Sequence, residues 1–174
     1  MIRCTMRATS RPPAAMEYAF YDEGGLKILH NRDHALADQF DYLFRELPLI
    51  PYTLSLIDAD ENERFRLERK TPAPFHTHAF RLSFDGETVD FFDDKTRFSL
   101  PNLSFFYRKK KYDIEGFIRS REFFIEENGE KLMAMTASPV VGGKEYAITI
   151  YKDALPLAVS FASAIILDIC FHNY

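Results

Sequence analysis

The densest group of side chains that could do chemistry is a run of four cations directly after three aromatic residues, Phe105 to Tyr107. Each Lys or Arg near an anionic surface contributes about 1 kcal/mol of binding, and neighbouring aromatic rings can enter a membrane interface. The residues of this candidate anionic-lipid or phosphate site are Arg108, Lys109, Lys110 and Lys111. The alternative, which we favour from the residues alone, is a solvated edge strand whose lysines discourage aggregation.

Two pairs of histidines have spacings that a metal site could use. His76 and His78 would share one face of a strand, and His30 and His34 lie four residues apart. Zinc takes three or four protein ligands, and neither pair has an evident third. We therefore expect no metal site.

Acidic residues provide no stronger candidate. Asp93-Asp94 and the stretch from Asp58 to Glu63 lack the ligand spacing and the glycine of a calcium loop, so we interpret both as acidic turns. Carboxylate pairs that form only in space cannot be read from a sequence. No glycine-rich phosphate loop follows a predicted strand, and the thiol of Cys170 has no activating context. We find no catalytic constellation and no cofactor motif, and we favour a non-enzymatic protein.

The composition bounds the class of protein. The chain has 174 residues, of which 47% are hydrophobic and 28% charged, values typical of a globular domain. The formal net charge of −4 argues against a nucleic-acid partner, because neutralising phosphates requires an excess of Lys and Arg. With only Cys4 and Cys170, a disulfide framework is not expected, and we predict a cytoplasmic protein.

The first sixteen residues differ from the rest. They contain no acidic residue and carry a stiff Pro12-Pro13 pair, and they lack the apolar core of a secretory signal. We expect residues 1–16 to be a disordered tail, or an extension upstream of a true start at Met16. The folded domain would then span residues 17–174.

Short apolar stretches separated by turn signals follow along most of the chain. The turn signals are Asp22 to Gly25, Asp58 to Asn62, Asp85 to Glu87 and Glu127 to Glu130. This pattern indicates an antiparallel β-sandwich or barrel rather than a parallel α/β sheet. We place one longer strand over residues 103–111, and we expect Gly116 to mark a bulge or a close approach between strands.

Two segments follow helical patterns. Residues 34–47 place apolar side chains on one helical face, with Asn31 or Asp33 available as the N-cap and Pro48 as the stop, so we predict an amphipathic helix there. The apolar side chains of that face are Leu36, Phe40, Leu43, Phe44 and Leu47.

The second helical segment, residues 154–167, is apolar on all sides except for two serines. We expect Asp153 to cap it and Pro156 to lie in its first turn. At about 1.5 Å per residue it reaches roughly 21 Å, short of the roughly 30 Å of a bilayer core, so we predict a buried core helix. The carboxylate of Asp168, just beyond, then needs a buried partner such as an Arg or a backbone N–H.

The order of several segments resembles tubby C-terminal-like proteins, a group that includes LURP-one-related proteins and phospholipid scramblases. The segments are Tyr112 to Gly116, Arg121 to Ile125, Glu127 to Glu130 and Tyr146 to Ile150, followed by the apolar helix. The resemblance covers roughly residues 50–171. It lies in order and pattern rather than in one diagnostic motif, and it is closest to small bacterial members of the group.

The resemblance implies a closed β-barrel with the final helix through its centre. It also implies an association with membrane phospholipids, which eukaryotic tubby domains bind through surface Lys and Arg. The chain lacks the palmitoylated cysteines, the calcium loop and the spanning segment of scramblases, so lipid transport is not expected. Fold family alone does not transfer function.

Three functional hypotheses follow. The first is a non-enzymatic domain that binds anionic phospholipid or phosphate headgroups at the inner membrane surface, as a peripheral protein. The second is a protein-interaction module with an unknown partner and no small ligand. The third is an enzyme or carrier that uses a barrel cavity, which the central helix would fill.

Overall fold

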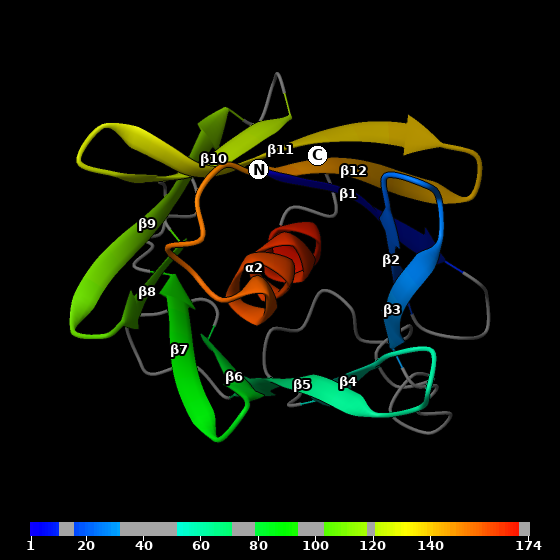
Figure 1. Ribbon diagram of the computed structural model, residues 1–174, viewed down its shortest axis with the longest axis horizontal. Helices are drawn as coiled ribbons and strands as arrows, with labels where there is room; N and C mark the ends of the chain where they lie inside the picture. Colours follow the sequence, from blue (N-terminus) through cyan, green and yellow to red (C-terminus); the bar gives the residue numbers. More distant parts are fainter. Residues whose placement is uncertain (11–15, 32–51, 71–78, 94–102, 118–120, 171–174) are drawn as a thin grey trace.

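The computed structural model describes residues 1–10, 16–31, 52–70, 79–93, 103–117 and 121–170. Within these residues, twelve antiparallel strands form one closed barrel around the helix α2 (Leu157–Cys170), which confirms the predicted fold class (Figure 1). The strands are β1 (Ile2–Ser10), β2 (Met16–Asp22), β3 (Lys27–Asn31), β4 (Tyr52–Ile57), β5 (Glu63–Lys70), β6 (Ala79–Phe84), β7 (Glu87–Asp93), β8 (Leu103–Tyr107), β9 (Lys110–Phe117), β10 (Glu122–Glu127), β11 (Glu130–Val140) and β12 (Gly143–Ile150).

Strand β1 closes the barrel, and this corrects our expectation of a disordered tail over residues 1–16. Cys4 pairs with Ile148 of β12 on one side and with Asp22 of β2 on the other. The buried side chains Cys4, Met6 and Ala8 alternate with polar ones, which is the period of a half-buried strand. The arginines and prolines of this stretch are typical of a tail, whereas its alternation is typical of a strand. Without β1, the edges of β2 and β12 would be exposed.

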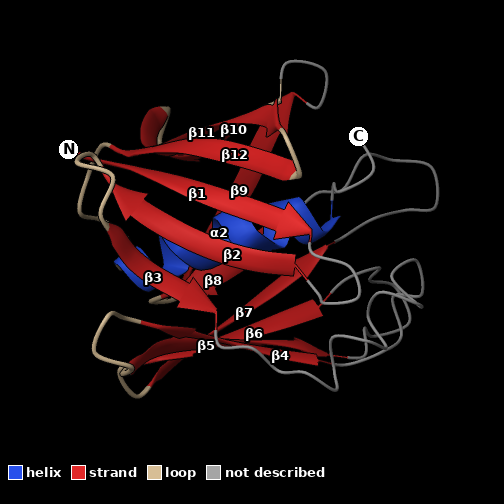
Figure 2. Cartoon of the chain, turned by 90° about the vertical axis from the view of Figure 1, so that its right-hand side faces the viewer, coloured by secondary structure: helices blue, strands red, loops and turns tan. Residues whose placement is uncertain are grey.

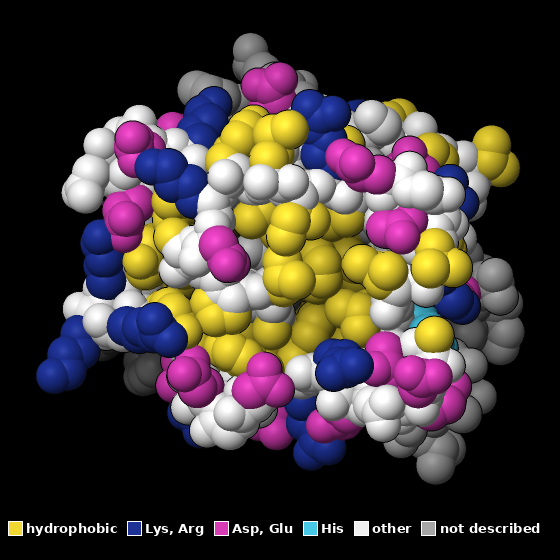
Figure 3. Space-filling view, viewed as in Figure 1, with side chains coloured by type: hydrophobic (Ala, Val, Ile, Leu, Met, Phe, Trp, Pro, Cys, Tyr) yellow, Lys and Arg dark blue, Asp and Glu magenta, His cyan; other side chains and the backbone are white. Residues whose placement is uncertain are grey.

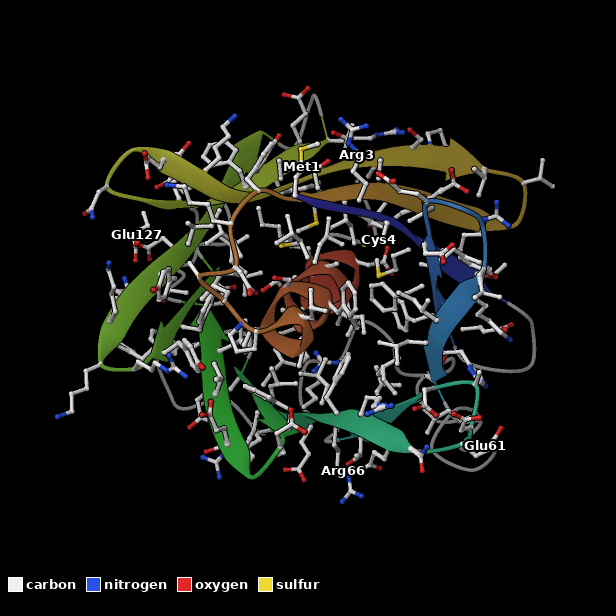
Figure 4. The ribbon with its side chains drawn as sticks, in the orientation of Figure 1. Met1, Arg3, Cys4, Glu61, Arg66 and Glu127 are labelled. Carbon is white, nitrogen blue, oxygen red and sulfur yellow. The ribbon has the colours of Figure 1, made fainter. Side chains whose placement is uncertain are left out.

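The core lies between the inner face of the barrel and α2. Strands β5, β6 and β7 alternate buried with exposed or half-buried residues, and the helix is buried continuously from Val159 to Asp168. The rings of Phe20 on β2 and Phe161 on α2 are 4.4 Å apart. The side chain of Cys4 points toward the helix (Figure 4). A helix enclosed on every side must be apolar all round, which explains its composition.

The helix begins slightly later than the sequence predicts. The carbonyl of Pro156 accepts hydrogen bonds from the backbone N–H groups of Val159 and Ser160, so the first helical residue is Leu157. The predicted cap, Asp153, lies in a turn before it. No helix among the described residues is long and apolar enough to cross a membrane.

The two ends of the barrel are built differently (Figure 2). At one end, which we call the short-turn end, the strands are joined by residues 23–26, 58–62, 85–86, 108–109 and 128–129. Residues 151–156 also lead into α2 there. At the opposite end, which we call the loop end, β3, β5 and β7 lead into longer connections, residues 141–142 join β11 to β12, and α2 ends. The predicted amphipathic helix 34–47 lies outside the described residues.

Close packing of neighbouring strands explains why position 116 is a glycine. A Cβ atom at Gly116 would lie 2.3 Å from the backbone oxygen of Glu122 on the paired strand β10. No side chain fits at that distance, so the expected close approach is confirmed.

Candidate functional site

The predicted basic run does not form one strand. Arg108 and Lys109 are the two central residues of a tight turn between β8 and β9, because Tyr107 pairs directly with Lys110. Both turn residues have left-handed backbone conformations, with φ of 49° and 66°. The prediction of one strand over residues 103–111 is therefore wrong. The turn at Arg108-Lys109 contains no glycine, proline, asparagine or aspartate, the residues that usually mark a turn in a sequence.

Two other hairpins of the barrel use the same turn geometry with different residues. Asp85-Gly86 and Asn128-Gly129 also have positive φ at both central positions, and their dipeptides are the ones such turns prefer. An L-residue other than Gly, Asn or Asp costs about 1 kcal/mol or more in this conformation. Arg108-Lys109 is therefore the unfavourable version of a turn that the same chain builds twice with favourable residues.

The other two cations of the run are bound to carboxylates. Lys110 donates to Glu127 on β10, and this hydrogen bond raises the pKa of Lys110 and lowers that of Glu127. The Nζ of Lys111 is 3.0 Å from a carboxylate oxygen of Asp113. Of the four predicted residues, the structure brings Arg108 and Lys109 together at the exposed tip and directs the other two toward neighbouring acids.

The aromatic residues beside the run separate between the two faces of β8. Phe105 and Tyr107 are buried inside the barrel, so they cannot enter a membrane interface as expected. Phe106 points outward, is 52% exposed, and stacks on Phe92 of β7 with ring centroids 6.0 Å apart. Only Phe106 therefore remains available beside the basic turn.

A second polar cluster lies inside the loop end, around Asp168 in the last turn of α2. One carboxylate oxygen accepts hydrogen bonds from the hydroxyl of Tyr146 at 2.7 Å and the ammonium of Lys144 at 3.3 Å. The other accepts from the hydroxyl of Tyr18 at 3.0 Å. The partner expected for this carboxylate was an Arg or a backbone N–H, and it is a lysine with two tyrosines instead.

The electrostatics of this cluster show why those partners are needed. Asp168 is completely buried, and a negative charge near a helix C-terminus is also disfavoured by the helix dipole. Lys144 offsets the charge, and the two hydroxyls complete the hydrogen bonding of the carboxylate. Burial and the adjacent carboxylate raise the pKa of Tyr146 above its ordinary value. The cluster holds the end of α2 against β2 and β12.

The alternation of the strands indicates which of these partners point inward. Tyr146 has the same strand parity as the buried Ile148 and Ile150, so it must point inward, and Lys144 continues that parity to the loop end. Tyr18 has the parity of the buried Phe20 on β2. That these three side chains meet Asp168 can be seen only in the three-dimensional structure.

The remaining sequence candidates lie apart from both clusters. The Asp58 carboxylate accepts the backbone N–H groups of Asp60 and Asn62 at 2.9 and 3.0 Å, which confirms an acidic turn. Asp93 is buried at the end of β7. The calcium and zinc candidates Asp94, His34, His76 and His78 lie outside the described residues. No three described His, Cys, Asp or Glu side chains form a group that could hold a metal ion.

Comparisons with known proteins leave the site to be interpreted from its own geometry. No family model, no curated protein and no solved structure matches this chain.

Proposed function

We propose that this protein is a non-enzymatic domain that binds anionic phospholipid or phosphate headgroups through the β8–β9 turn, as a peripheral protein at the inner membrane surface. The observation that carries the proposal is the Arg108-Lys109 pair in a conformation that favours Asn-Gly. Residues kept in an unfavourable backbone conformation concentrate at functional sites. Two exposed cations at the tip of a hairpin are a local anion-binding element.

The resemblance to tubby C-terminal-like proteins supports this proposal. A closed barrel with a C-terminal helix is consistent with that group, in which association with membrane phospholipids is a shared theme. Phe106, exposed on β8 beside the turn, adds an aromatic side chain that can enter the interfacial layer.

The geometry limits the strength of such binding. Lys110 and Lys111 are engaged by Glu127 and Asp113, so two of the four cations are already partly neutralised. Two cations at about 1 kcal/mol each give weak, salt-sensitive binding. Stable attachment to a membrane then requires several copies or a second contact.

The test is co-sedimentation with vesicles of phosphatidylcholine alone or with phosphatidylserine, at low and high salt. The decisive variant combines Arg108→Asn with Lys109→Gly, which keeps the turn and removes both charges. A control, Lys27→Asn with Lys152→Asn, removes two exposed charges at the same end of the barrel, of which Lys152 is paired with Glu130. Titration with inorganic phosphate, followed by the amide shifts of residues 107–110, distinguishes free phosphate from a lipid surface as the ligand.

The turn variant is expected to lose binding to anionic vesicles and, at the same time, to unfold at a higher temperature. Binding is lost with the two charges, whereas stability increases because the favourable turn dipeptide stabilises the fold by about 1 kcal/mol. The control should retain most of the binding. Absence of salt-sensitive binding by the folded wild-type protein, or equal loss in the control, would overturn the proposal.

A further inference from the structure

The short-turn end of the barrel has an apolar hollow at its centre. Figure 3 shows hydrophobic atoms lining a depression beside the start of α2, with charged side chains around its rim. Leu29 and Phe84 bury their side chains near this end, and Ile28 and Ala158 are partly buried against the same core. The surface at the centre of this end is therefore apolar rather than polar.

Large apolar side chains are exposed at the same end. Leu26 in the β2–β3 turn is 68% exposed, and Leu157, the first residue of α2, is 43% exposed. Ile2 begins β1, and Tyr151 follows the end of β12, so both also lie at the short-turn end. Single exposed apolar residues are ordinary, whereas several at one end of the barrel indicate a contact surface.

The rim beside this hollow is acidic on three consecutive turns of the barrel. The turns β2–β3, β4–β5 and β6–β7 follow one another in the strand order. Their exposed acids are Glu23, Asp60, Glu61, Asp85 and Glu87. Within this arc, Arg64 binds Asp58 at 2.6 Å. This arc attracts cations and repels a second copy of the same arc.

We infer that the short-turn end docks a basic segment of another protein that inserts a large apolar side chain into the hollow. The apolar hollow supplies a pocket for the anchor residue, and the acidic arc selects Lys or Arg on either side of it. This surface is separate from the Arg108-Lys109 turn, so the inference goes beyond the proposed headgroup binding and does not depend on it.

The experiment uses three synthetic twelve-residue probes and the full chain with isotope-labelled Leu methyl groups. The first probe has a central Leu-Phe pair between lysines. The second replaces the pair with Ser-Ser, and the third replaces the lysines with glutamates. The variant Leu26→Ser with Leu157→Ser removes two exposed apolar side chains of the short-turn end. Val141→Ser at the loop end is the matched control, because Val141 is fully exposed there.

The first probe is expected to bind saturably, to shift the Leu26 and Leu157 methyl resonances, and to bind about tenfold or more weakly to the double variant. The Ser-Ser probe should lose a similar factor, the glutamate probe should not bind, and Val141→Ser should leave the affinity unchanged. Arg108→Asn with Lys109→Gly should also leave it unchanged, which separates this inference from the proposed function. Equal binding of the first two probes, or no effect of the double variant, would overturn the inference.

Discussion

The two ends of the barrel differ in what fills them. At the loop end, the interior contains a buried carboxylate whose charge and hydrogen bonds are met by Lys144, Tyr146 and Tyr18. At the short-turn end, the centre is an apolar hollow, and the charged side chains lie around it (Figure 3). The helix α2 connects them, entering at the apolar end and ending in the polar cluster.

The difference shows how one helix can be fixed inside a barrel. Apolar packing is non-directional and permits an apolar helix to slide or rotate, whereas a carboxylate with three donors specifies one position. The loop end therefore sets the register of α2, and the short-turn end is left free to present an open surface. Four predictions test this division, from the largest expected effect to the smallest.

Removing the buried counter-charge should have the largest effect. Lys144→Met leaves the Asp168 carboxylate without its cation and should reduce the free energy of unfolding by roughly 3 kcal/mol. The same substitution at the short-turn end, Lys152→Met, breaks only an exposed pair with Glu130 and should change it by less than about 0.5 kcal/mol. Urea unfolding of the two variants measures the difference. Equal losses would remove the contrast between the ends.

Alkaline pH should destabilise the protein because a buried thiol inside the barrel loses its proton. Burial raises the pKa of the Cys4 thiol from 9.0 to about 11, so the folded state holds this proton more tightly than the unfolded state. Stability is then complete below pH 9 and falls by about 2 to 3 kcal/mol as pH rises toward 11.

The Cys4→Ala variant identifies the source of that loss. Urea unfolding under reducing conditions at pH 8 and pH 11 should show a smaller decrease for the variant than for the wild type. Tyr146, with its raised pKa, contributes a further decrease that begins above pH 10, and it is unaffected by this substitution. An identical decrease in wild type and variant would contradict the assignment to Cys4.

The two ends should also differ in how much a tyrosine hydroxyl contributes to the free energy of unfolding. Tyr146→Phe removes a buried donor to a charged oxygen and should cost about 2 kcal/mol. Tyr112 donates to Glu127 at 3.1 Å at the more exposed short-turn end, so Tyr112→Phe should cost clearly less. Thermal unfolding of both variants, with Tyr18→Phe as a second loop-end test, measures this. A larger loss for Tyr112→Phe would contradict the comparison.

Exchange of turn residues should have the smallest effect. Placing the unfavourable pair in the β10–β11 hairpin, as Asn128→Arg with Gly129→Lys, should reduce stability by about 1 kcal/mol, because both positions require positive φ. The measurement is the unfolding midpoint in urea. No change would mean that the turn conformation carries no cost, and the proposed function would lose its main support.

The general architecture was predictable because its signals are local. Each signal can be recognised within a few residues of sequence. The signals are the turns Asp85 to Glu87 and Glu127 to Glu130, the alternation of the strands and the all-apolar helix. These signals identify an antiparallel barrel or sandwich, and the sequence resemblance favoured the barrel. Strand β1 was not predicted although Cys4, Met6 and Ala8 alternate in the same way, because the composition of residues 1–16 is that of a tail.

The sites were less predictable because they depend on residues brought together from distant positions. Asp168 and Tyr18 are in contact although almost the whole chain separates them. The basic run was recognised, but its division into a turn and two ion pairs depends on the register of β8 with β9 and on Glu127 of β10. Side-chain type alone cannot determine which charges a fold leaves exposed.

The position of α2 in chain order has a consequence for how the protein is made. The helix follows all twelve strands, so every inward-facing apolar side chain emerges from the ribosome before the element that covers it. Strand β1 must likewise wait for β12, its distant partner across the closure. Pairings of such long range form slowly, and a half-made barrel exposes its interior while they form. We therefore expect folding during synthesis to depend on chaperones more than the small size of the protein indicates.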